Sequence, residues 1–201
     1  MKCEASTLGH FLYRVAMCGF RYHYYRYAVI DIPEGKDLAA TDKKLMQVYG
    51  VVRCRMKRFR QRQQGFASTQ YVRFGHSFIL MATEGEHSAF SNLKNYDVRT
   101  SPLHFHRYSI GLRGSTVSVE VEKRVWIAVE RKVQRLALHD RALIEARMST
   151  LPFYRFSGVE KQKTDLMRKI NRRRKTAGLP LVLPHPSAQA CRYQDTSGIA
   201  V

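Results

Sequence analysis

The stretch QYVRFGHSFILMAT (residues 70–83) is rich in β-branched, aromatic and other apolar residues and carries a glycine near its middle. This composition predicts one long strand, or two short strands broken at Gly75. Upstream, residues 24–33 predict another strand, which Pro33 ends. Asp37 predicts the N-cap of a helix that runs to Gly50. Residues 51–60 are predicted to form a further strand, so the expected order to this point is β-α-β-β.

Residues 84–93 predict a short helix, and the run PLHFHRYSIGL (residues 102–112) predicts a strand. A last strand is expected at residues 116–121, after a tight turn at Gly114. The order β-α-β-β-α-β with one additional strand is typical of the α+β class. We therefore predict a ferredoxin-like (split βαβ) antiparallel sheet with helices on one face, followed by a C-terminal helical extension.

The C-terminal part predicts helices over residues 124–148, with a break at His139-Asp140. A last helix is expected to begin at Ser157, whose spacing to Glu160 has the form of a capping box, and to end at Gly178. The expected organisation is an N-terminal extension (1–22), the ferredoxin-like core (23–123), the helical extension with its basic last helix (124–180) and an extended tail (181–201).

Positive charge dominates the composition. The 201 residues include 35 Lys and Arg against 16 Asp and Glu, with a formal net charge of +19 and a pI of about 10.2. Such a field favours a polyanionic partner, in the first place RNA or DNA, alone or in a nucleoprotein assembly. No amphipathic helix predicts membrane binding; an acidic protein partner and a solvated basic surface without a dedicated partner are the remaining alternatives. The scattered cysteines and the lack of a recognisable signal peptide predict a cytoplasmic protein.

Two basic segments are the predicted phosphate-binding sites. The expected strand at residues 51–60 is basic on both faces, so we predict that it projects as a hairpin arm closed by QRQQG; a charged, protected edge strand is the alternative. In the last helix, NRRRK exceeds what the helix dipole alone explains. The predicted phosphate-binding residues are Arg53, Arg55, Lys57, Arg58, Arg60, Arg62, Arg73, Lys161, Lys163, Arg168, Lys169, Arg172, Arg173, Arg174 and Lys175.

Aromatic residues interleave with arginines in two predicted strands. On a sheet with one open face, such aromatics stack on unpaired bases while the arginines hold phosphates. The candidate stacking residues are Tyr25, Tyr27, Tyr71 and Phe74. Burial in the core is the alternative role for each of them, and the chain has no match to the RNP1 pattern.

His104 and His106 flank Phe105 in a predicted strand, so both imidazoles are expected on one face, where they can share a divalent ion. These residues resemble the His-hydrophobe-His strand of HUH endonucleases, which include rolling-circle initiators, relaxases and single-strand transposases. The resemblance implies an Mg²⁺ or Mn²⁺ ion at the two histidines and a nucleophilic tyrosine, for which Tyr154 is the candidate. The chain has no Y-x-x-K motif, and the available third ligands are Asp31, His76 and His87.

Taken together, the sequence favours a nucleic-acid-binding protein over an enzyme and calls for no cofactor. Single-stranded or structured RNA is slightly favoured over DNA, because the interleaved aromatics suit unpaired bases and no familiar duplex-reading helix is evident. The alternative function is a metal-dependent, HUH-like single-strand endonuclease or transposase that uses His104, His106 and Tyr154.

Overall fold

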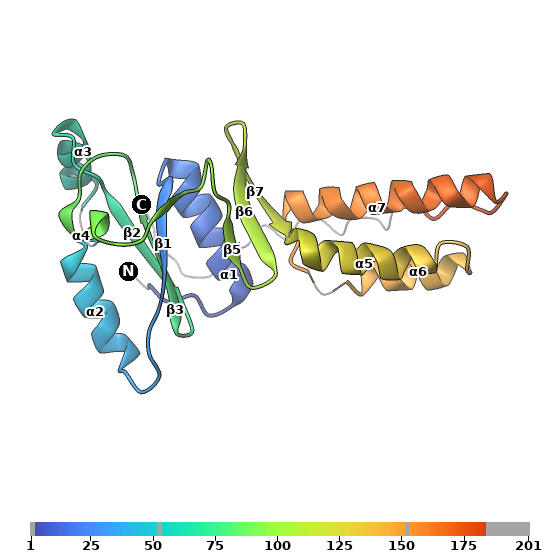
Figure 1. Ribbon diagram of the computed structural model, residues 1–201, viewed down its shortest axis with the longest axis horizontal. Helices are drawn as coiled ribbons and strands as arrows, with labels where there is room; N and C mark the ends of the chain where they lie inside the picture. Colours follow the sequence, from blue (N-terminus) through green and yellow to red (C-terminus); the bar gives the residue numbers. More distant parts are fainter. Residues whose placement is uncertain (1–2, 52–53, 152, 184–201) are drawn as a thin grey trace. The chain divides into compact units, whose positions relative to one another are not determined.

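The computed structural model describes residues 3–51, 54–151 and 153–183 and shows a mixed α+β protein with antiparallel sheet (Figure 1). The chain divides into two compact units. Unit 1 comprises residues 1–103 and 110–118, and unit 2 comprises residues 104–109 and 119–201. Across the described residues, every helix is too short or too polar to cross a membrane.

Unit 1 contains a four-stranded sheet in the order β2-β3-β1-β4. Its strands are β1 (Arg26–Asp31), β2 (Thr69–Phe74), β3 (Ser77–Ala82) and β4 (Tyr96–Asp97). β3 runs antiparallel to both β1 and β2, so β1 and β2 are parallel to each other and separated by β3. The β2–β3 hairpin turns at Gly75, which has a φ of +59°. The prediction of two short strands broken at this glycine is therefore confirmed.

The N-terminal residues form a helix that belongs to the core of unit 1. Helix α1 (Leu8–Tyr13) continues as a π-helix (Arg14–Gly19, η1) and a 3₁₀ turn (Phe20–Tyr22, η2). Buried residues recur every four positions along it, at Phe11, Val15 and Gly19, and again at Leu12, Ala16 and Phe20. A π-helical turn lengthens the repeat beyond 3.6 residues, so the sequence period was not recognised and these residues were assigned to an extension.

The predicted strand at residues 51–60 is wrong, because α3 (Arg55–Gln63) is a helix. Arg, Lys, Met and Gln all favour the helix, and the last β-branched residue before it is Val52. Before α3, α2 (Leu38–Val48) begins as predicted, with the Asp37 side chain accepting from the Ala39 and Ala40 amides. The order β-α-β-β is still obtained, but β2 and β3 supply the second and third strands.

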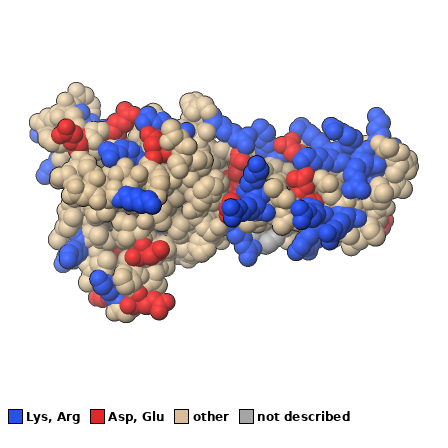
Figure 2. Space-filling view, viewed as in Figure 1, with Lys and Arg blue, Asp and Glu red and all other residues tan. Residues whose placement is uncertain are grey.

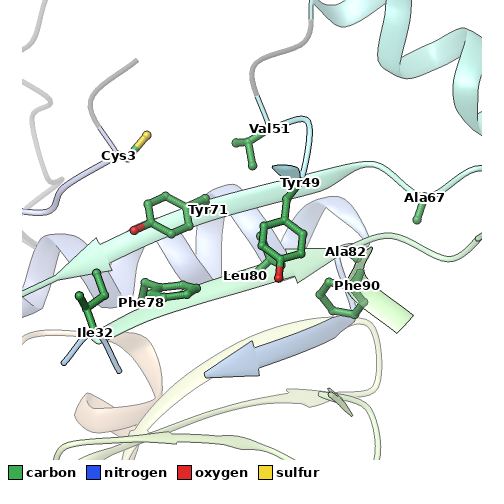
Figure 3. Close-up of a cluster of buried hydrophobic side chains, with 10 residues drawn as sticks. All are labelled: Cys3, Ile32, Tyr49, Val51, Ala67, Tyr71, Phe78, Leu80, Ala82 and Phe90. Atoms are coloured by element: carbon green, nitrogen blue, oxygen red, sulfur yellow. The ribbon is translucent and has the colours of Figure 1, made fainter. Parts of the chain in front are cut away.

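A buried cluster lies between the sheet and the segments that pack on it in unit 1 (Figure 3). Ile30 and the α2 residues Leu38, Leu45 and Met46 pack against it from partly buried positions. The short helix predicted within residues 84–93 is present as α4 (Ser88–Ser91) and contributes the fully buried Phe90. The cluster comprises Cys3, Ile32, Tyr49, Val51, Ala67, Tyr71, Phe78, Leu80, Ala82 and Phe90.

A second sheet has the order β5-β6-β7, and its residues are divided between the two units. The strands are β5 (Leu103–Phe105), β6 (Tyr108–Arg113) and β7 (Thr116–Val121). The single strand expected over residues 102–112 is broken at His106, whose φ of 53° lies in the left-handed region. The turn predicted at Gly114 is present, with a φ of +62°.

Unit 2 contains three helices, α5 (Lys123–Arg135), α6 (Arg141–Ser149) and α7 (Ser157–Thr176). The predicted break at His139-Asp140 is confirmed, and the Asp140 side chain accepts from the Ala142 amide. α7 spans the predicted residues and ends before Gly178, which has a φ of +67°. The predicted capping box is wrong: the N-cap position is Phe156, without a side-chain cap, and Glu160 binds the Lys163 ammonium instead.

Candidate nucleic-acid interface

Helices α5 and α7 lie side by side and run parallel within unit 2. The Gln162 amide exchanges two hydrogen bonds with the backbone of Val121, at 2.9 and 3.0 Å. About two turns further along both helices, Lys169 Nζ lies 2.6 Å from Glu130 Oε1. Trp126 and Val133 of α5 and Leu166 and Ile170 of α7 form the buried faces of these helices. The opposite face of each helix is therefore exposed to solvent.

The exposed face of α5 carries a line of arginines. Arg124, Arg131 and Arg135 stand at positions i, i+7 and i+11, which fall on one stripe of a helix, and all three are exposed. Lys123 and Lys132 are exposed on the same helix. This stripe was not predicted from the sequence, because only the apolar period of residues 124–148 was used there. The periodic arginines opposite Trp126 were the signal that could have found it.

The exposed face of α7 repeats this spacing. Lys161, Arg168 and Arg172 again stand at i, i+7 and i+11, and Lys175 extends the line by one turn. Fourteen residues of α-helix span about 21 Å, so this line presents charge over several phosphate spacings. The Arg168 guanidinium contacts the Asp165 carboxylate at 3.0 Å, but both side chains are largely exposed, so the pair is weak.

We call these two lines the basic stripes: Arg124, Arg131 and Arg135 of α5, and Lys161, Arg168, Arg172 and Lys175 of α7. Figure 2 shows Lys and Arg side chains gathered over the part of the molecule that α5, α6 and α7 form. Residues 123–176 contain sixteen Lys and Arg against five Asp and Glu. The positive field of the chain is therefore concentrated on this helical part.

Several predicted phosphate contacts of α7 instead hold the helices together. Arg174 is 2% exposed, and its guanidinium donates to the backbone carbonyls of Pro180, Ala137 and His139 at 2.7–2.9 Å. The prediction that Arg174 contacts phosphate is therefore wrong, because a buried guanidinium is satisfied by these carbonyls. Arg173 donates to the Gln134 carbonyl at 2.7 Å.

The other basic segment is helical rather than extended. On α3, the side chains of Lys57, Arg60 and Arg62 are exposed and Arg58 is half-buried. The helix contains no acidic residue. Arg53 lies outside the described residues. The charges predicted on a hairpin arm thus surround a helix in unit 1.

The sheet of unit 1 has no open face at the predicted stacking residues. Tyr71 pairs with Leu80 and Tyr27 with Met81, and residues opposite each other in a ladder share a face, so the two tyrosines lie on opposite faces. Tyr71 is 1% exposed within the buried cluster, and Tyr27 is 4% exposed against Phe20 of the N-terminal helical segment. Both rings are core residues, and the prediction that they stack on bases is wrong.

Polar contacts hold these two tyrosines in place. The Tyr71 hydroxyl donates to Asp42 at 2.5 Å, and the Tyr27 hydroxyl donates to the Ser101 carbonyl at 3.1 Å. Burial raises the pKa of each hydroxyl, and for Tyr71 the bond to the Asp42 carboxylate raises the pKa further.

Arg73, a predicted phosphate contact, is 4% exposed and pairs with Asp42 at 2.9 Å and Glu4 at 3.3 Å. Arg73 therefore anchors α2 and the N-terminal segment to β2.

The remaining stacking candidates are half-buried. The Arg99 guanidinium lies 4.7 Å from the centroid of the Tyr25 ring, and His23 Nδ1 lies 2.6 Å from its hydroxyl. The Phe74 ring packs against Phe11 with 5.9 Å between centroids. Neither ring is presented openly to solvent, so the stacking role has little support on the sheet.

His104 and His106 do not form the expected pair on one strand. His104 is exposed on β5, whereas His106 lies in the turn that follows, because its left-handed backbone ends the strand. Within residues 3–51, 54–151 and 153–183, no three or more His, Cys, Asp or Glu side chains are grouped so that they could hold a metal ion. The two histidines are thus left without a third ligand of these types in the described structure.

The other residues of the endonuclease prediction have separate contacts. Tyr154 lies between α6 and α7, and its backbone amide donates to the Tyr108 hydroxyl at 3.0 Å. Asp31 accepts from the Ser77 hydroxyl, and His76 Nδ1 lies 3.3 Å from the Ile32 carbonyl. The His87 side chain caps α4. Asp31, His76 and His87 thus have hydrogen-bond partners within unit 1, whereas the contact of Tyr154 involves its backbone and not its hydroxyl.

Comparisons with protein-family models, with curated proteins and with solved structures found no match to this chain.

Proposed function

We propose that this protein binds nucleic acid through phosphate contacts made by the basic stripes of α5 and α7. The observation that carries the proposal is the repeated i, i+7, i+11 spacing of exposed basic residues on two parallel helices. Phosphates form a regular polyanion, and a line of guanidinium and ammonium groups along a rigid helix neutralises several of them at once. The counterions released by this neutralisation supply the binding free energy.

A membrane surface fits the stripes less well. Peripheral helices insert large apolar side chains into the lipid boundary, opposite a charged face. In the described structure the large apolar residue exposed on α5 is Ile127, and α7 exposes none. The other large apolar residues of these helices are buried or half-buried, so their outer faces offer charge without a broad apolar anchor.

We further propose that the sheet of unit 1 has the ferredoxin-like, split βαβ arrangement. The antiparallel pairing and the position of β3 between the parallel strands β1 and β2 support this topology.

We also propose that the protein acts in the cytoplasm, free or in a nucleoprotein assembly. The preference for RNA loses the support of Tyr27 and Tyr71, so the choice between RNA and DNA is left to the binding experiment.

Fluorescence anisotropy with matched single-stranded RNA, single-stranded DNA and duplex, each titrated at several salt concentrations, tests the proposal. The test variant replaces Arg124, Arg131 and Arg135 by Gln. The control replaces Lys36, Lys43 and Lys44, three exposed lysines of unit 1, by Gln and thereby removes the same net charge. Since each lost phosphate contact lowers the salt slope by about 0.7 to 0.9, we expect the α5 variant to lose about two to three units of slope.

The control variant is expected to keep most of the slope and affinity of the natural sequence. An equal loss in both variants contradicts a located site and indicates a general charge effect. Failure of the natural sequence to bind any of the three ligands near physiological salt contradicts nucleic-acid binding altogether, and points to an acidic protein partner for the stripes.

A further inference from the structure

Helix α3 of unit 1 exposes apolar side chains that its packing does not explain. Met56 is 60% exposed and Phe59 is 51% exposed, and their i, i+3 spacing places them on one face of the helix. Phe66, three residues beyond the end of the helix, is 47% exposed. Single exposed apolar residues are ordinary, but Met56 and Phe59 share one helix face, and the Phe66 backbone lies next to the end of the same helix, so we treat the three as one candidate patch for a ligand.

Basic residues border this patch on both sides. On a helical projection Arg60 lies about 40° from Met56, and Arg62 lies about 60° from Phe59 on the other side. Lys57 is also exposed but lies about 160° from Phe59 on this projection, and residues 54–66 contain no acidic side chain. The Phe59 ring therefore lies on a narrow apolar face with an arginine on each side.

This arrangement discriminates between the anionic ligands that α3 could bind. Lipid-bound helices place charge opposite a wide apolar face, whereas on α3 the apolar face is narrow, because Arg60 and Arg62 flank Met56 and Phe59 directly. Duplex nucleic acid keeps its bases stacked inside, so exposed phenylalanine rings find no base to contact. Unpaired nucleotides offer both parts at once, a base face for each ring and a phosphate for the neighbouring cation.

The backbone holds Phe66 in a fixed position next to α3. The Phe66 amide donates to the Gln61 carbonyl at 2.9 Å, and the Gly65 carbonyl accepts from the Glu86 amide at 2.9 Å. Gly85 makes this approach possible, because a Cβ at that position would lie 2.6 Å from the Gly65 carbonyl oxygen. The Phe66 ring is thus presented from a braced backbone rather than from a free loop, which reduces the ordering entropy that binding must overcome.

We infer that α3 is a separate binding site for unpaired nucleotides, with Phe59 and Phe66 stacking on bases and with Arg60 and Arg62 contacting the neighbouring phosphates. This inference deepens the proposed function and rests on it. It assigns to unit 1 the recognition of single strands, while the stripes of unit 2 supply phosphate contacts for single strands and duplexes alike.

The test replaces Phe59 and Phe66 together by Ala in the full chain and measures affinity for a single strand and for the matched duplex. Stacking on one base is worth at least about a five-fold change in affinity, so we expect at least that loss for the single strand. The duplex affinity is expected to stay within about two-fold, since phosphate contacts remain. The double variant Tyr13→Ala with Tyr22→Ala, which removes two other exposed rings of unit 1, is the control and is expected to bind as the natural sequence does.

A second variant, Phe59→Trp with Phe66→Tyr, keeps aromatic faces and is expected to restore single-strand binding. Quenching of 2-aminopurine placed in the strand reports stacking directly and is expected to disappear only in the alanine variant. Unchanged single-strand affinity in the alanine variant, or an equal loss for the duplex, overturns this inference while leaving the proposed function intact if the α5 variant still loses its salt slope. Binding of α3 to anionic vesicles in preference to the single strand also overturns it.

Discussion

Helices α3 and α7 are both strongly basic, but they use their charge differently. α7 buries Val159, Leu166 and Ile170 against its neighbours, and its cations divide between internal contacts and the solvent. Among the described side chains of α3 none is fully buried, and its exposed cations surround exposed aromatic residues. The number of basic residues therefore does not identify a ligand site, because burial determines which charges a ligand can contact.

The free energy of desolvation explains why buried cations are not available to a ligand. A guanidinium removed from water must find hydrogen-bond acceptors, and a folded chain supplies them as backbone carbonyls or carboxylates. Arg174 and Arg73 are satisfied in this way, by carbonyls and by Asp42 respectively. An exposed cation such as Arg172 or Arg60 remains hydrated and can exchange its water for a phosphate.

The substitution Arg174→Ala should have the largest effect on stability, and it tests most directly the difference between buried and exposed cations. It leaves three carbonyls without their donor and a cavity beside α7, so we expect the free energy of unfolding of unit 2 to fall by about 3 kcal/mol. Urea unfolding measures the change. Arg60→Ala on α3 is the matched control and should change stability by less than about 0.5 kcal/mol. A similar effect for both substitutions would remove the distinction between the helices.

The substitution Tyr71→Phe tests the role of the buried tyrosine of the sheet, in contrast to the exposed Phe59 of α3 and Phe66 beyond it. It removes the hydroxyl bond to Asp42, and we expect a loss of about 1.5 kcal/mol in stability with no change in nucleic-acid affinity. Burial raises the pKa of Tyr71 above its ordinary value, so the folded state keeps a proton that the unfolded state releases. This stabilisation is complete below pH of about 10 and is lost as the pH rises further.

The natural sequence should therefore lose stability above pH of about 10 more steeply than Tyr71→Phe. Unfolding by urea at several alkaline pH values measures both slopes. Parallel slopes would show that Tyr71 is not the group responsible, and reduced single-strand affinity in this variant would return the stacking role to the sheet.

Arg172→Ala and Arg173→Ala compare neighbouring residues of α7 with different surroundings. Arg172 belongs to the exposed stripe, whereas Arg173 donates to the Gln134 carbonyl. We expect Arg172→Ala to reduce the salt slope by about one unit with a few-fold loss of affinity, and Arg173→Ala to reduce it less. Salt-dependent anisotropy distinguishes them, and the reverse order would show that internal contacts do not decide availability.

His104→Ala is expected to have the smallest effect, with binding unchanged within error, because His104 belongs to neither basic helix. The measurement is the same anisotropy series, accompanied by incubation of a labelled single strand with Mn²⁺ or Mg²⁺. Cleavage of the strand by the natural sequence, abolished in His104→Ala, would replace simple binding by the endonuclease alternative.

Local signals in the sequence were enough for many elements. Asp37 predicted the start of α2, Gly75 the β2–β3 turn, His139-Asp140 the break before α6, and Gly178 the end of α7. Each of these signals acts on the backbone of its own neighbourhood, through a cap, a left-handed turn or a break in an apolar period. Such effects do not depend on distant contacts, so a single sequence contains them.

Two of the errors arose from local patterns that were interpreted wrongly. A run of cations without an apolar period left α3 open to interpretation as a strand, and the π-helical repeat of residues 14–19 concealed an N-terminal helix that covers one face of the sheet.

The sequence alone was enough to predict the cap at Asp37, the turns at Gly75 and Gly114, the approximate positions of most strands and the excess of positive charge. The burial of Tyr27 and Tyr71 and the role of Arg174 in holding helices together became visible only in the folded structure. Caps and turns depend on neighbours along the chain, whereas burial and the choice of hydrogen-bond partner depend on segments that meet only after folding.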